Sequence, residues 1–122
     1  MTEENPTPPR LFAAETLRWR LMNDEDLMKD VMDACLIDLS SNFDRFAKQL
    51  TEGQIEEASK TAHAIKGSAQ TSDLKALALL AAEIETALLS GDTAVAQGRL
   101  GALSKLVEDS IRAVKEYFSK RP

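Results

Sequence analysis

The chain has 122 residues, of which 43% are hydrophobic and 29% charged, and its formal net charge is −5. This length predicts one compact domain, and the acidic balance argues against nucleic-acid binding, because a basic surface is needed to neutralise phosphates. Good helix formers dominate and only five glycines and four prolines occur, so the composition predicts an all-α protein.

Several classes of feature are missing from the sequence. No stretch approaches the roughly 20 apolar residues that a membrane span requires, and residues 1–10 lack the apolar core of a signal peptide. Cys35 is the only cysteine, which leaves neither a disulfide framework nor a thiolate metal site. We therefore expect a cytoplasmic protein with no membrane segment, no bound metal and no cofactor of its own.

The N-terminal region divides into two parts. Residues 1–9 are polar and rich in proline, so they predict a disordered lead before a domain over residues 10–120. A short helix is expected from about Leu11 to Met22. Trp19 and Met22 are expected to pack this helix onto the rest of the domain, and the alternative is that they belong to an exposed docking patch.

The longest amphipathic pattern predicts a helix from about Asp24 to Leu50. Asn23 or Asp24 is a suitable N-cap, and Gly53 is a suitable residue to end this helix. Its apolar residues recur at steps of three and four, at Met28, Met32, Cys35, Leu39, Phe43, Phe46 and Leu50.

Two shorter helices follow, at about residues 54–70 and 74–89. The first has a stripe of mostly small residues, which predicts close neighbours: Ile55, Ala58, Ala62, Ile65 and Ala69. The second repeats the spacing with Leu74, Leu77, Ala81, Ile84 and Leu88. Between them, Thr71-Ser72-Asp73 offers N-cap chemistry for the second helix.

The last element is predicted as one helix from about Thr93 to Ser119, with Val95 among its buried residues. Gly91 is expected to terminate the preceding helix and Asp92 to cap this one. No alternating pattern indicates a strand. Because the loops are short, we expect an antiparallel up-and-down four-helix bundle with a short additional N-terminal helix.

One segment contains a side chain that could act as a nucleophile. This side chain is His63, the only histidine. Helical spacing places His63 away from the apolar stripe, with Lys66, Gly67 and Gln70 at the following three, four and seven positions. Ser59 and Lys60 are predicted on the same polar side. A neutral imidazole has one nitrogen free to act as a nucleophile, and a nearby lysine can balance the charge of a phosphoryl group.

Gly67 is unusual because a glycine inside a helix costs about 0.8–1 kcal/mol relative to alanine. Its missing side chain would leave the imidazole open to a large partner. The alternative interpretation is that His63 is an ordinary surface residue and that Gly67 only permits close packing.

The motif His63-x-x-Lys66-Gly67-Ser68 resembles the signature of histidine-containing phosphotransfer (HPt) domains. The similarity extends to the acidic start of the second helix (Asn23–Leu27), to Leu77–Glu85 and to the turn Ser90-Gly91-Asp92. It covers roughly residues 11–118 in the right order and spacing. The turn Ser72-Asp73-Leu74 departs from the family, as do Gln70 and Thr71, which could alter the choice of partner.

The resemblance implies roles for four residues. His63 would be the phosphoacceptor through its Nε2 atom, Lys66 the cation near the phosphoryl oxygens, and Gly67 the residue that keeps the site open. Glu85 matches a family position whose side chain can orient the histidine by a hydrogen bond.

The resemblance also implies partners. Response-regulator receiver domains and a hybrid sensor histidine kinase would exchange phosphoryl groups with the chain, and the receiver would supply Mg²⁺. Such a carrier has no kinase activity and is expected to be a monomer. The contacts with the partner would include Ser59, Lys60, Ser68 and Gln70.

Two alternatives stay open at this point. The chain could be a helical adaptor that binds partners without phosphotransfer, although an adaptor has no need of Gly67. It could also be the phosphoacceptor domain of a larger kinase of the chemotaxis type. The start at Met1 and the short tail after Ser119 favour a free-standing protein over this second alternative.

Overall fold

The computed structural model describes residues 10–120, so the predicted disordered lead lies outside the described residues. Helices account for most of this part of the chain, and no strand occurs in it. The elements in order are α1 (Ala14–Arg20), α2 (Glu25–Thr51), α3 (Ile55–Thr71), α4 (Lys75–Leu89), α5 (Thr93–Gly98) and α6 (Leu100–Ser119).

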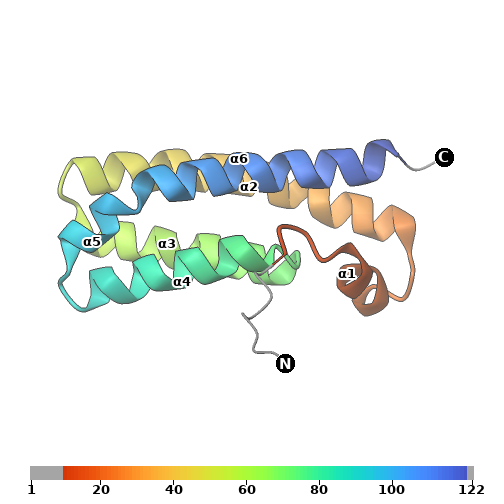
Figure 1. The fold of residues 1–122 in the computed structure, drawn as a ribbon, viewed down its shortest axis with the longest axis horizontal. Coiled ribbons are helices and arrows are strands. Elements are labelled where there is room, and N and C mark those ends of the chain that lie inside the picture. Colours follow the sequence, from red (N-terminus) through yellow and green to blue (C-terminus); the bar gives the residue numbers. More distant parts are fainter. Residues whose placement is uncertain (1–9, 121–122) are drawn as a thin grey trace, which may run out of the picture.

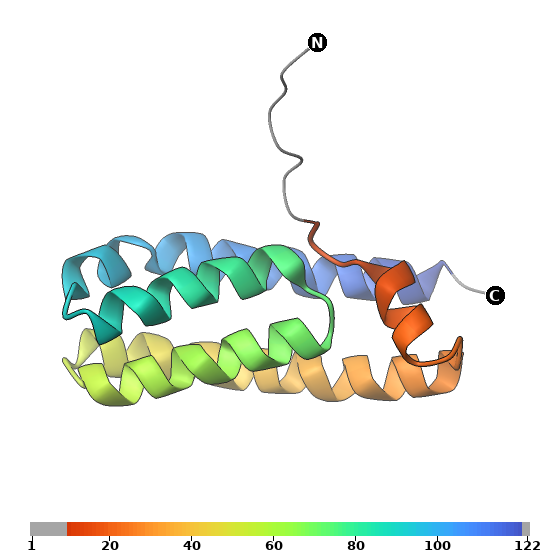
Figure 2. The same ribbon diagram turned by 90° about the horizontal axis from the view of Figure 1, so that it is seen from below.

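Helices α2, α3, α4 and α6 form the predicted antiparallel four-helix bundle (Figure 1). Helices α2 and α6 extend past one end of the shorter α3–α4 pair. The additional helix α1 occupies the space beyond the α3–α4 turn, beneath this overhang (Figure 2). The all-α fold class is therefore confirmed.

The predicted apolar stripes of α2, α3 and α4 form the core. Phe46, Ile65 and Ile84 have no exposed surface, and the small residues of α3 let its neighbours approach closely. Asp24 caps α2 as predicted, because its carboxylate accepts a hydrogen bond of 3.0 Å from the backbone N–H of Leu27. The turn after α2 is at Gly53, where φ is +77°, a conformation that favours glycine.

The first helix is shorter than predicted, and the packing predicted for its aromatic residue was wrong. Residues 10–13 are not helical and run beside the α3–α4 turn, where the N–H of Ala13 donates to the carbonyl of Asp73 at 2.9 Å. Trp19 is 78% exposed and Met22 is 88% exposed. A helix of only two turns has one face to bury, and Leu17 occupies that face.

The N-cap prediction for α4 was also wrong, because Leu74 occupies the N-cap position of this helix. Asp92 is the N-cap residue of α5 as predicted, although its side chain makes no cap hydrogen bond. Asp73 has φ of +57° and lies just after the end of α3. Its buried carboxylate binds Arg20 at 2.5 Å, so this aspartate fastens α1 to the bundle instead of starting α4.

The single last helix predicted over 93–119 is two helices, α5 and α6, separated at Arg99. Gly98 and Gly101 flank the break, and glycine weakens a helix because it loses the most backbone freedom on folding. The break lets α5 turn at the end of the bundle (Figure 1). As a result Ala96 is buried. Val95 is 46% exposed, so the prediction that it is a core residue was wrong.

Candidate functional site

The site lies where α3 and α4 face each other. These two helices make the most extensive contact in the described part of the chain, because alanines such as Ala62 and Ala81 bring their backbones close together. His63 comes from α3 and Glu85 from α4. The α3–α4 hairpin therefore joins two side chains that are 22 positions apart in the sequence.

Three side chains form one hydrogen-bonded cluster. The Nδ1 atom of His63 lies 2.8 Å from Oε2 of Glu85, and the Nζ atom of Lys66 lies 2.8 Å from Oε1 of the same carboxylate. The His63 side chain is 66% exposed, whereas those of Lys66 and Glu85 are 24% and 15% exposed. The imidazole thus stands in solvent on a largely buried ion pair.

The electrostatics of this cluster determine the tautomer of the neutral imidazole. Burial alone would raise the pKa of Glu85, but the hydrogen bonds and charges of Lys66 and His63 outweigh it and hold that pKa below its usual value. Glu85 is therefore ionised at neutral pH, and an ionised carboxylate only accepts hydrogen bonds. The proton of a neutral His63 must lie on Nδ1, which leaves the lone pair of Nε2 available to attack an electrophile.

Gly67 lies one turn beyond His63 and faces open space. A Cβ atom built at this position would meet no atom within 4 Å, so the packing of the chain does not require glycine here. This excludes the alternative that Gly67 only permits close packing. The space belongs to an open groove between α2 and α3, lined by Val31, Ala34, Cys35, Asp38, Gly67, Ser68, Thr71 and Ser72.

The predicted partner-contact residues differ in how exposed their side chains are. Lys60 and Gln70 are exposed on α3, and Ser68 is half-buried in the wall of the groove. Ser59 was placed wrongly on the polar side. Its side chain is buried, and its hydroxyl donates a hydrogen bond of 2.8 Å to the carbonyl of Glu56.

Sequence reasoning missed the part of the site that comes from α2. Val31, Ala34 and Asp38 line the groove beside Gly67, but no chemical motif in their own segment identifies them. Their three- and four-residue spacing along one edge of α2 was the available signal. That signal becomes useful only when α2 is known to lie next to α3.

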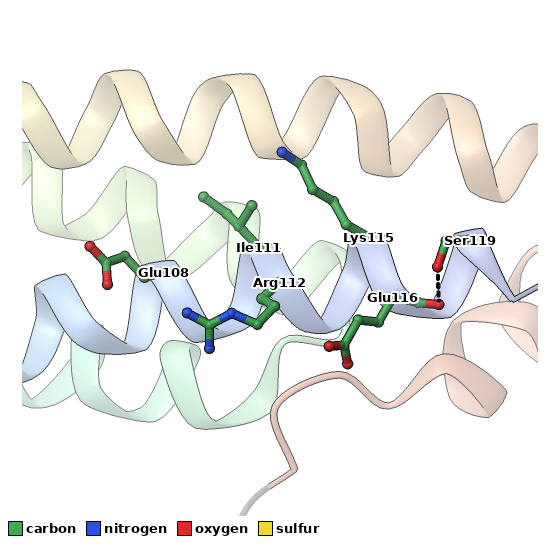
Figure 3. A pocket seen from close by; sticks show the side chains of 6 residues that line it. All are labelled: Glu108, Ile111, Arg112, Lys115, Glu116 and Ser119. Atoms are coloured by element: carbon green, nitrogen blue, oxygen red, sulfur yellow. Dashed lines mark hydrogen bonds between the residues drawn. The ribbon is translucent and has the colours of Figure 1, made fainter.

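Other parts of the surface offer less chemistry. A shallow depression along α6 is lined mainly by charged side chains, including Glu108, Arg112 and Lys115, with Ile111 beside them and no histidine (Figure 3). Within residues 10–120 no group of three or more His, Cys, Asp or Glu side chains is arranged to hold a metal ion. In the same part of the chain, no helix is both long and apolar enough to cross a membrane.

Comparison with known proteins gives one family. No curated protein and no solved structure gives a significant match to the chain. The family model of the Hpt domain matches residues 30–116, which is well over half of the chain and includes His63, Lys66, Gly67 and Glu85. Hpt domains are phosphocarriers rather than kinases, and they interact with receiver domains and histidine kinases in phosphorelays. The chain belongs to the Hpt domain family and so to the histidine phosphotransfer proteins of two-component signalling.

Proposed function

We propose that this protein relays a phosphoryl group between aspartates of receiver domains, carrying it on Nε2 of His63 and using no kinase activity of its own. The observation that carries the proposal is the hydrogen bond between Nδ1 of His63 and Glu85. That bond holds the proton on Nδ1, so that the second ring nitrogen stays unprotonated in solvent. Phosphoryl transfer needs mostly positioning and charge stabilisation, and this arrangement supplies both.

The groove beside Gly67 is the site at which we propose that the receiver domain docks. A receiver seated over α2 and α3 would contact Ser68 in the groove, and Lys60 and Gln70 on the exposed side of α3. Because Gly67 has no side chain, the donor can come close to the imidazole. The Mg²⁺ ion that neutralises phosphoryl oxygens belongs to the receiver domain.

The transfer is a single displacement at phosphorus. The Nε2 lone pair of His63 forms the N–P bond while the P–O bond to the receiver's aspartate breaks, and the electron pair of that bond goes to the aspartate carboxylate. Nδ1 keeps its proton, so the ring gains a positive charge that Glu85 offsets. The reverse sequence delivers the phosphoryl group to the next receiver.

The test uses receiver domains from the same organism that have been phosphorylated with ³²P. We expect acid-labile, alkali-stable label on the wild type, no label on the His63→Gln variant, and unchanged label on the Trp19→Ala control, which alters an exposed residue of α1. Equal labelling of His63→Gln would refute the proposal.

Two other results would favour the alternatives. Receiver binding that survives in His63→Gln, with no transfer even in the wild type, would favour an adaptor. Labelling only by a kinase catalytic domain would favour the acceptor domain of a larger kinase. The proposed carrier acts as a monomer in the cytoplasm, and sedimentation of the phosphorylated and unphosphorylated protein checks its oligomeric state.

A further inference from the structure

Among the described residues, Asp38 is the only charged one that lines the groove between α2 and α3. The rest of the lining consists of small apolar side chains, a thiol and hydroxyl groups. Asp38 is exposed, and within residues 10–120 its carboxylate makes no ion pair. By contrast, Asp33 on the same helix pairs with Lys29 at 3.0 Å. The groove therefore offers one unpaired carboxylate to whatever fills it.

The pairing of α2 with α3 places Asp38 at the end of the groove nearer to His63. The Sγ atom of Cys35 lies 3.9 Å from the carbonyl oxygen of Ser68, so these two residues are level along the antiparallel helices (Figure 1). From that level, Asp38 is three positions forward on α2, and His63 is five positions back on α3, in the same direction. At a rise of 1.5 Å per residue, Asp38 and His63 are separated by only about 3 Å along the bundle axis. A receiver that reaches His63 through this groove must therefore cover Asp38.

The carboxylate of Asp38 also acts on the floor of the groove. Burial is the main cause that raises the pKa of the Cys35 thiol, and the negative charge of Asp38 raises it further, while a hydrogen bond with Ser72 opposes both. The thiol is therefore protonated at neutral pH and adds no charge of its own. The groove thus presents a single negative charge beside an apolar floor.

We propose that Asp38 is a specificity-determining residue, which selects receiver domains that place a lysine or arginine over the His63 end of the groove. The inference rests on the proposed function of His63 and on docking of the receiver in this groove. It adds the chemistry of the preferred partner, which presents apolar side chains to Val31 and Ala34 and one cation to Asp38.

A cation at this position would be favoured for two reasons. A basic side chain attracts the carboxylate of Asp38 across the interface, which speeds docking and fixes its register. A receiver without the cation buries this carboxylate without a partner, and a receiver with an acidic side chain there meets repulsion. Because specificity is the difference between such free energies, a residue that never touches the phosphoryl group can decide which receiver is used.

The experiment measures kcat/KM for transfer from phosphorylated receiver domains of the same organism to the full chain. For the preferred receiver, Asp38→Lys should lower kcat/KM at least about tenfold, the scale of one close charge pair at an interface. The loss should appear in KM and not in kcat, and added salt should reduce it. Asp44→Lys is the matched control, because it makes the same charge change at an exposed residue of α2 that does not line the groove.

A compensating change in the receiver tests the pairing directly. In the preferred receiver, each surface lysine and arginine is replaced in turn by glutamate. One of these receiver variants should transfer poorly to the wild-type chain and recover transfer to Asp38→Lys. If none of them does so, the pairing assigned to Asp38 is overturned.

Phosphoramidate, a small phosphoryl donor that needs no partner protein, separates the inference from the function on which it rests. It should label the wild type, Asp38→Lys and Asp44→Lys equally. If the wild type takes up no phosphoryl group from phosphoramidate or from any receiver, the proposed function fails. If the wild type is labelled but Asp38→Lys and Asp44→Lys accept phosphoryl groups equally well from every receiver, the function stands and the role of Asp38 is overturned. Weaker labelling of Asp38→Lys by phosphoramidate would show damage to the site itself and would also overturn the inference.

Discussion

Replacement of Gly67 by alanine should make the protein more stable. Gly67 lies well inside α3 (Ile55–Thr71), and a Cβ atom there would meet no atom within 4 Å. The substitution therefore recovers the helix propensity of alanine, about 0.8–1 kcal/mol, without a steric cost. For a domain of this size that gain should raise Tm by about 3–6 °C in a thermal melt followed by circular dichroism.

The same position should show the opposite effect on function when the side chain is larger. A leucine at 67 would project into the groove beside His63, where a receiver is proposed to dock. We expect Gly67→Leu to slow transfer from a phosphorylated receiver at least about tenfold, the scale of a misplaced reacting pair. Labelling by phosphoramidate should be unchanged, because this small donor does not need the groove.

The control for this prediction is Gly101→Ala in α6, which also faces open space and lies far from His63 in the sequence. It should gain less stability, because Gly101 is in the first turn of its helix, and it should transfer phosphoryl groups normally. A Gly67→Ala protein that melts below the wild type would contradict the open space at this position. Normal transfer from receivers to Gly67→Leu would refute the role of Gly67 in access.

Three further perturbations test the fold and the ion pairs. Leu17→Ala should cost about 2–4 kcal/mol in urea denaturation, because Leu17 is fully buried, whereas Trp19→Ala should change stability by less than about 0.5 kcal/mol. Arg20→Ala leaves the buried Asp73 carboxylate without its closest cation and should cost about 1–3 kcal/mol, reduced because the guanidinium is partly exposed. The pKa of Glu85 in the folded state is lower than its ordinary value of 4.5, so the ionised carboxylate stabilises the folded state when the pH is above 4.5. The urea midpoint of the wild type should therefore exceed that of Glu85→Gln at pH 7, and this difference should shrink as the pH falls below 4.5.

Periodicity predicted the bundle well because its signal is local. The apolar steps along α2, α3 and α4 match the buried residues of the structure, and Asp24 caps α2 as its sequence indicates. The errors lie where a tertiary contact overrides local preference. Asp73 has the chemistry of an N-cap, yet its carboxylate is taken by Arg20 from α1, a residue 53 positions away.

The candidate site shows the same division. The motif around His63 is contiguous on one helix, so the sequence could single out His63, Lys66 and Gly67. The proximity of Glu85 to His63 was anticipated from the family resemblance, whereas its ion pair with Lys66 was not. The wall that α2 contributes to the groove depends on how two helices lie side by side, which no local pattern encodes.

The most direct test of the account is the position of the phosphoryl group on the imidazole ring. Two-dimensional NMR that correlates ring protons with ¹⁵N, recorded on the phosphorylated protein, distinguishes the two nitrogens of His63. The hydrogen bond from Nδ1 to Glu85 predicts phosphorylation at Nε2, with the proton retained on Nδ1. Phosphorylation at Nδ1, or at any residue other than His63, would contradict the account.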